Sequence, residues 1–248
     1  MVVKSTTFGR ALVVSSDLKG YGRGNDKRHE TMQAEFVRIQ QAATQAAGLN
    51  RDAWERQPGG DGELAVLPAG EPEIRVIDQY VRELGKQLRD YNADLPLEER
   101  LRLRVAMAFG TAYPAANGYA GQAVVEASRL LSCRPLKLLL DRRPEVDLAL
   151  ILSQRVFDET VRQGHTSYSL SEFREVQVQE KEYVSSAWIR VAGIDVSDLS
   201  SLFAETEPEP SGPSPRHVVG AMTQKAEVIT NLYGAVDARN AVFGVSGK

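Results

Sequence analysis

The stretch of the chain that decides the fold is RALVVSSDLKGYGRG, at residues 10–24. Its first part, 10–16, is a short continuous run that predicts a buried strand. Three glycines then predict a loop: Gly20, Gly22 and Gly24. Asp17 stands at the junction, and strand ends on a rigid sheet are where folds present functional groups. The stretch therefore predicts a buried strand that carries a carboxylate at its end.

The pattern of the remaining chain predicts a sheet layered with helices. Apolar residues at steps of three and four predict helices over 29–48 and 74–91. Between them, the Gly-Asp-Gly tip at 60–62 predicts a hairpin. Further strands are predicted over 100–109, 147–152, 176–178 and 187–191, with helices ending near 131 and 164 between them. This order predicts a mixed sheet in an α+β or α/β fold.

Composition limits the class of protein. The 248 residues carry 30 Lys and Arg against 33 Asp and Glu, a net charge of −3, with 42% apolar and 25% charged residues. These values are typical of a soluble globular protein and give no general attraction to nucleic acid or anionic membrane. The arginines at 100, 102 and 104 are interpreted as the solvated face of a strand. With no apolar run near the ~20 residues of a membrane span and no signal-peptide core, a cytoplasmic location is expected.

The chain contains few soft metal ligands. Its single cysteine, Cys133, excludes an intramolecular disulfide and any multi-cysteine metal site. The three histidines are isolated from one another: His29, His165 and His217. If the protein holds a metal, carboxylates must bind it.

Composition also divides the chain. The amino-acid composition changes after Leu202. Residues 205–215 hold four prolines among Glu, Ser and Gly, which is typical of a linker. We therefore predict a domain over 1–204, a linker over 205–216 and a tail or interaction segment over 217–248.

Two carboxylates are the first candidates for chemistry. If the hairpin lies beside the first strand, Asp17 and Asp61 approach each other and need a counter-ion, for which Mg²⁺ is the usual choice. The glycine loop at 19–24 adds backbone N–H groups that can meet phosphate oxygens. Together these features indicate phosphoryl or nucleotidyl transfer. The alternative is that Asp17 is a turn residue and Asp61 a plain hairpin tip.

Four segments resemble, in order and spacing, the motifs of class III nucleotidyl cyclases, the catalytic domains of adenylate and guanylate cyclases. They are VSSDLKGY (14–21), GDGELAV (60–66), RVAMAFG (104–110) and GQAVVEASRL (121–130). The resemblance covers residues 10 to about 192. It implies an α+β fold with a ferredoxin-like βααββαβ core, a mixed sheet, extra helices and a C-terminal hairpin.

The resemblance also implies roles for individual residues. Asp17 and Asp61 match the aspartates that bind two Mg²⁺ or Mn²⁺ ions, and Leu18 matches the residue that offers a backbone carbonyl. Arg129 matches the arginine that stabilises charge on the α-phosphate, which a guanidinium can meet through two oxygens. Further nucleotide contacts are implied at Lys19, Gly20, Tyr21, Gln57, Gly118 and, by a looser match, Lys181. In the family the working unit is a head-to-tail homodimer, in which the aspartates of one protomer face the arginine helix of its partner.

Three positions depart from the purine cyclases of this family. Gln57 replaces a base-reading lysine, Gly118 replaces its aspartate partner, and Val125 replaces a transition-state asparagine. One interpretation is a cyclase with altered base choice, similar to the stand-alone pyrimidine (UTP or CTP) cyclases of bacterial anti-phage signalling. The other is a catalytically weak cyclase-like module that binds a nucleotide or a partner. The two aspartates and Arg129 favour the enzyme, and Val125 favours the binding module.

The tail carries its own pair of alternatives. Residues 226–244 are short β-prone stretches with Asn and Gly turns. They resemble the amyloid-type signalling motifs of some bacterial defence proteins, which would recruit an effector protein by strand stacking. The alternative is a strand and a short helix that pack back onto the cyclase-like domain or complete the dimer. The charges of Glu227, Asp237 and Arg239 favour this second interpretation.

Overall fold

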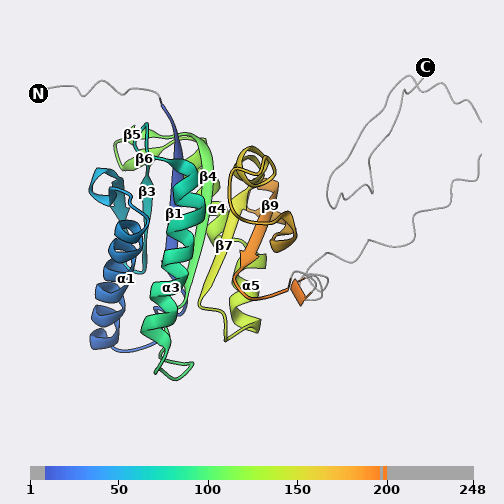
Figure 1. Cartoon of the computed structure of the whole chain (residues 1–248). Helices are drawn as coiled ribbons and strands as arrows, with labels where there is room; N and C mark the ends of the chain where they lie inside the picture. Colours follow the sequence, from blue (N-terminus) through green and yellow to red (C-terminus); the bar gives the residue numbers. More distant parts are fainter. Residues whose placement is uncertain (1–8, 196–197, 200–248) are drawn as a thin grey trace, which may run out of the picture. The chain divides into compact units, whose positions relative to one another are not determined.

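The computed structural model describes residues 9–195 and 198–199 (Figure 1). A seven-stranded sheet runs in the order β2-β3-β1-β4-β7-β9-β8. Its strands are β1 (Arg10–Leu18), β2 (Glu55–Pro58), β3 (Gly62–Val66), β4 (Leu103–Thr111), β7 (Leu148–Ser153), β8 (Arg174–Glu180) and β9 (Tyr183–Val191). Within it β4 and β7 pair in parallel, and the other neighbours are antiparallel. The predicted α+β fold with a mixed sheet and a late hairpin, here β8–β9, is confirmed.

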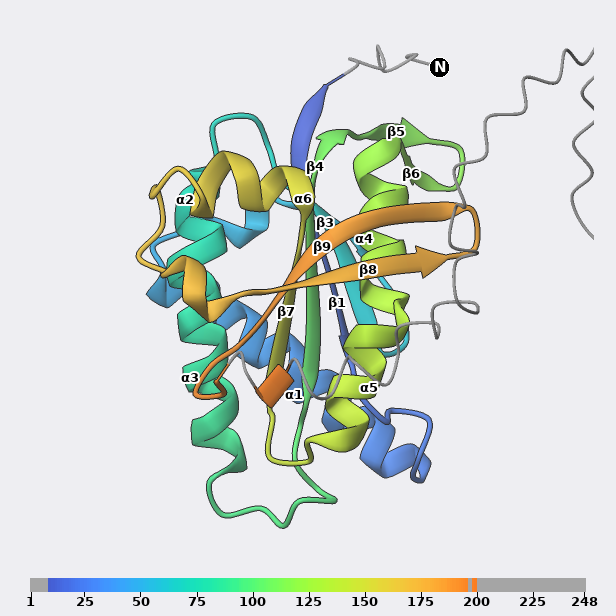
Figure 2. The same cartoon turned by 90° about the vertical axis from the view of Figure 1, so that its right-hand side faces the viewer.

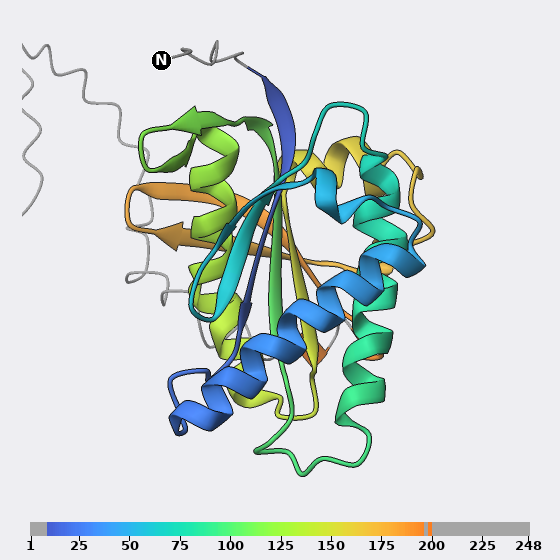
Figure 3. The same cartoon turned by 90° about the vertical axis from the view of Figure 1, so that its left-hand side faces the viewer.

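Helices cover both faces of this sheet. Helices α1 (Asp26–Ala46) and α3 (Val81–Asn92) lie on one face (Figure 3). Helices α4 (Gln122–Ser132) and α5 (Arg134–Arg142) lie on the other (Figure 2). Shorter elements complete the fold: η1 (Arg51–Ala53), α2 (Glu73–Arg75), the π-helical turn η2 (Val76–Tyr80), β5 (Tyr113–Ala115), β6 (Gly118–Ala120), α6 (Gln154–Val156), the π-helical turn η3 (Phe157–Val161) and η4 (Leu170–Glu172).

Successive side chains of β1 point to opposite faces of the sheet and pack into different parts of the core. Leu12, Val14 and Leu18 pack into the cluster that includes α1 and α3. Val13 packs with alanines of α4 on the opposite face. Because successive side chains point to opposite sides of a strand, Asp17 shares the α4 side with Val13. The chemistry-bearing end of β1 therefore faces α4 and α5.

The sequence predicted most elements and missed two. The helices over 29–48 and 74–91 are found as α1 and as the α2–η2–α3 segment, and Ser153 caps α6 by accepting a hydrogen bond from the N–H of Val156 at 3.2 Å. Helix α5 and the β5–β6 pair were not predicted. Each is short, with at most nine residues, so periodicity over a window gives little signal. Cys133, between α4 and α5, is buried as a free thiol, and burial raises its pKa to about 11.

The predicted linker at 205–216 and tail at 217–248 lie outside the described residues, and their roles stay predictions. Within the described part of the chain, no helix combines the length and apolar character needed to cross a bilayer.

Candidate active site

The structure places the two predicted metal-binding aspartates on neighbouring segments, Asp17 in β1 and Asp61 in the tip of the β2–β3 hairpin. Asp17 lies opposite Gly62 in the β1–β3 register, and the N–H of Leu18 donates to the carbonyl of Asp61 at 2.7 Å. Gly62 makes this approach possible, because a Cβ at this position would lie 2.1 Å from the carbonyl oxygen of Ser16. The hairpin therefore lies beside β1 as the sequence predicted, and it brings both carboxylates to one end of the sheet.

Asp17 is held by Arg104, which the sequence pattern had indicated to be part of a solvated strand face. Arg104 lies opposite Asp17 on β4 and donates from Nε and Nη2 to its two carboxylate oxygens, at 2.7 and 2.6 Å. The side chains of the pair are only 13% and 16% exposed, so Arg104 is not part of a solvated strand face. Burial raises the pKa of Asp17, the charge of Asp61 raises it further, and Arg104 opposes both. Arg104 alone thus leaves the pair of aspartates incompletely neutralised.

The other two arginines of this strand segment are also engaged. Arg102 donates to the carbonyl oxygens of Leu140, Arg143 and Val146, at 2.6–2.8 Å, where α5 ends. Arg100 donates to the carbonyl of Leu95 at 3.2 Å. The prediction of a wet arginine face was wrong because the chain after α5 and the loop before β4 cover it.

The oxygen donors at this end of the sheet fit a hard divalent cation. Leu18 has a hydrocarbon side chain that is buried, so the oxygen it can offer to a metal is its backbone carbonyl. Among the described residues, no three His, Cys, Asp or Glu side chains gather as a metal site. Mg²⁺ is commonly held by one or two carboxylates and completed by water and substrate phosphates. The incompletely neutralised aspartates match that pattern.

The glycine loop is tied to the neighbouring elements. Gly20 has a φ of +77°, which favours glycine. Lys19 forms an ion pair with Asp141 at the end of α5, and burial together with nearby arginines lowers the pKa of Lys19. Tyr21 stacks on His29 with ring centroids 4.6 Å apart. The loop therefore has a defined conformation beside the aspartates.

A glutamine that sequence reasoning missed joins this loop to the hairpin tip. Gln33 of α1 donates from Nε2 to the hydroxyl of Tyr21 at 2.8 Å and to the carbonyl of Gly60 at 2.7 Å. It lies on the exposed side of the helix, where no periodicity signal distinguishes it from a solvated residue.

Behind the aspartates lies a buried polar network. Ser16 and Glu63 are register partners in β1 and β3. Ser16 directly precedes Asp17, and Glu63 lies two residues after Asp61. Gln40 of α1 donates to Ser16 Oγ at 2.9 Å and accepts from the hydroxyl of Tyr80. Arg51 forms an ion pair with Glu63 at 2.7 Å, with side chains only 1% and 7% exposed. These contacts fix the two strand ends from the α1 side.

Arg129 contacts the β8–β9 turn that contains Lys181. Arg129 of α4 donates from Nη2 to Glu182 at 2.9 Å, and Glu182 follows Lys181 in the β8–β9 turn. Lys181 has a φ of +56° and an exposed side chain. No hydrogen bond or ion pair between described residues joins Arg129 to Asp17 or Asp61. Val125, one turn earlier on α4, is 46% exposed.

The two positions that match the base-reading residues of the purine cyclases are in contact. Gln57 of β2 lies against Gly118 of β6, so that a Cβ on Gly118 would be 2.3 Å from Oε1 of Gln57. Next to Gly118, Tyr119 forms a hydrogen bond with Glu55, and burial raises the pKa of Tyr119 to about 12. Gly118 thus makes room for the amide of Gln57.

Comparison with solved structures identifies the fold. The adenylate/guanylate cyclase/hydrolase from Silicibacter pomeroyi is 19% identical, with a TM-score of 0.55 over 74% of this chain and 97% of that one. The guanylyl cyclase Cya2 is 15% identical, with a TM-score of 0.53 over 76% and 94%. The catalytic core of a rhodopsin-guanylyl cyclase with converted specificity, in complex with ATPαS, is 14% identical, with a TM-score of 0.50 over 74% and 95%.

This chain has the fold of a nucleotidyl cyclase domain. No family model and no curated protein sequence matches it. At such low identities the likeness establishes the fold alone, and the roles of the cyclase-like site residues remain predictions.

Proposed function

We propose that the protein is a metal-dependent nucleotidyl cyclase that converts a nucleoside triphosphate to a 3′,5′-cyclic nucleotide and pyrophosphate. The observation that carries this proposal is the placement of Asp17 in β1 beside the β2–β3 hairpin tip that contains Asp61, with Gly62 permitting the close approach of the two segments. Two incompletely neutralised carboxylates next to a glycine loop are suited to two Mg²⁺ or Mn²⁺ ions and a triphosphate.

In the proposed reaction, the 3′ oxygen forms a bond to the α-phosphorus while the bond from that phosphorus to the bridging oxygen of the leaving pyrophosphate breaks. The proton of the 3′ hydroxyl passes to solvent. Bound metal ions would supply positive charge to the triphosphate and favour the ionised 3′ oxygen. Asp17, Asp61 and the Leu18 carbonyl would hold those ions, and Arg129 would stabilise charge on the α-phosphate oxygens.

We further propose that the site is shared between two copies of the chain. Arg129 contacts the β8–β9 turn that contains Lys181, and no described polar contact links either residue to the aspartates of the same chain. A head-to-tail homodimer would bring the aspartates of one protomer to Arg129 of its partner. The exposed apolar side chains of Val125 and Val184, on α4 and β9, are available for such an interface.

The side chain at the candidate base-reading position is an uncharged amide. Gln57 offers both a donor and an acceptor, in place of a lysine that can only donate. It lies against Gly118, which carries no side chain to recognise a base. This arrangement supports a pyrimidine triphosphate, UTP or CTP, as substrate, and a role in bacterial anti-phage signalling is the setting that the sequence resemblance implies.

A specific observation also favours the second candidate, a nucleotide- or partner-binding module without strong catalysis. Arg104 already engages both oxygens of Asp17, and Val125 cannot donate a hydrogen bond to a transition state. Incubation of the purified chain with each of the four nucleoside triphosphates, in Mg²⁺ or Mn²⁺, distinguishes the two. The cyclase requires a cyclic nucleotide product from at least one triphosphate. Saturable nucleotide binding without any product would support the binding module instead.

A further inference from the structure

Three arginines surround a cavity on the face of the sheet opposite the candidate active site. The cavity has a volume of about 150 Å³ and lies between α3 and the strands β7 and β9. Its lining residues are Val81, Arg82, Gly85, Arg89, Leu148, Leu150, Arg190 and Ala192. Leu148 and Leu150 belong to the core shared with α1 and α3, whereas Asp17 faces α4 and α5. The cavity is therefore separate from the aspartates.

Two of these arginines are held in fixed positions. Arg82 donates to Asp78 and Ser167 at 2.6 Å, and Arg190 donates to Glu172 at 2.7 and 3.0 Å. Both guanidinium groups also lie on the ring of Tyr168, at 4.6 and 4.1 Å from its centroid. Such ordered groups lose little freedom when they bind a ligand.

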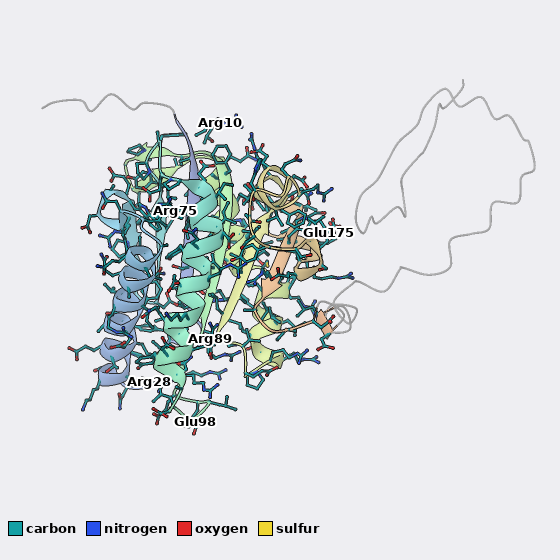
Figure 4. The ribbon with its side chains drawn as sticks, in the orientation of Figure 1. Arg10, Arg28, Arg75, Arg89, Glu98 and Glu175 are labelled. Atoms are coloured by element: carbon teal, nitrogen blue, oxygen red, sulfur yellow. The ribbon has the colours of Figure 1, made fainter. Side chains whose placement is uncertain are left out.

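The third arginine lacks a close counter-charge. Arg89 lies on α3 beside β7 (Figure 4), and it makes no hydrogen bond or ion pair with any residue of 9–195 or 198–199. Its Nη1 passes 3.4 Å from the point that a Cβ on Gly85 would occupy, so the glycine opens the floor of the cavity. Asp147 interacts with it only at longer range, from an adjoining cavity of about 240 Å³ that Glu145 also lines.

We propose that this cavity binds a small oxyanion, a phosphate or carboxylate group, between Arg82, Arg89 and Arg190. Guanidinium groups recognise both anions through paired hydrogen bonds, and no carboxylate lines the smaller cavity. Asp78 and Glu172 already pair with Arg82 and Arg190, so Arg89 supplies the positive charge that an anion would neutralise. The buried side chains of Val81, Leu148 and Leu150 form the apolar part of the cavity lining. Glu145 and Asp147 line the adjoining cavity and would repel an anion there, so the anionic group is confined to the cavity lined by the three arginines.

The test is titration of the 248-residue chain with inorganic phosphate or succinate, followed by amide NMR, with sodium chloride at matched ionic strength as the reference. Saturable shifts at Gly85 and Ala192 with either anion support the proposal, and the two arms separate a phosphate from a carboxylate ligand. Arg89→Ala should weaken binding at least about tenfold. Lys86→Ala, which removes an exposed charge on the same helix outside both cavities, should leave it unchanged.

A second variant separates loss of binding from loss of folding. Gly85→Ala adds a methyl group that meets Arg89 and Leu148 at 3.4 and 3.5 Å and replaces a glycine inside a helix. The melting temperature without anion should rise, because alanine favours the helix, while anion affinity should fall. The proposal is overturned if neither anion gives saturable shifts, or if Arg89→Ala responds as the wild type does. These readouts are independent of cyclase activity.

Discussion

Replacing Glu63 with glutamine removes the carboxylate that neutralises the buried guanidinium of Arg51. The Arg51 side chain is 1% exposed, and its Nε and Nη2 atoms have no hydrogen-bond partner among the described residues. Glu63→Gln keeps the shape of the side chain but leaves a buried charge without compensation. Loss of one partner of a buried ion pair costs about 3–5 kcal/mol of the free energy of unfolding. For a domain of this size that corresponds to a fall of roughly 6–20 °C in melting temperature.

Chemical denaturation and calorimetry would measure this effect against two controls. Glu35→Gln removes the partner of Arg38 in an exposed ion pair whose side chains are 24% and 50% exposed, and it should cost less than about 1 kcal/mol. The double variant Arg51→Met with Glu63→Met removes both buried charges and should recover most of the lost stability. If Glu63→Gln costs no more than Glu35→Gln, the pair is not desolvated and the reasoning is refuted.

Three further predictions concern the candidate active site. Asp61→Ala should abolish metal-dependent turnover but leave the melting temperature near that of the wild type, because the exposed hairpin tip fills no core; retained turnover would show that Asp61 is only a turn residue. Mixing Asp17→Ala protein with Arg129→Ala protein should restore partial activity through one intact shared site, and no rescue between soluble, dimeric variants would argue against sharing. Gly62→Ala should cost about 1–3 kcal/mol of stability, as overpacked sites do, because its Cβ meets the β1 backbone; an unchanged melting temperature would mean that the two strands can separate there.

The order of elements was predictable because it depends on local patterns. The continuous apolar run of β1 and the Gly-Asp-Gly tip predicted a strand and a hairpin, and the register of β1 with β3 shows that the two lie side by side. The helical periodicities before and after the hairpin were equally strong. Each of these signals lies within about 20 residues of chain, where propensity and burial act together.

The partners of the candidate site were not predictable in this way. Arg104 follows a pattern of alternating polar and apolar residues that is typical of a strand with one wet face, and only the tertiary structure shows that its side chain is covered and paired with Asp17. Arg51 and Gln40 are single polar residues near helix-forming segments, without a motif around them. Their importance comes from contacts with Ser16 of β1 and Glu63 of β3, which belong to other elements and carry no sequence pattern that marks the pairing.

The measurement that tests the central claim most directly is the stoichiometry of products from a single triphosphate. Metal-free protein would be incubated with UTP, CTP, ATP or GTP before and after addition of Mn²⁺, and cyclic nucleotide and pyrophosphate would be quantified together. The account predicts equal amounts of the two products, formed only after the metal is added and absent with Asp17→Asn. Pyrophosphate without cyclic nucleotide, or product formation that Asp17→Asn leaves intact, would contradict it.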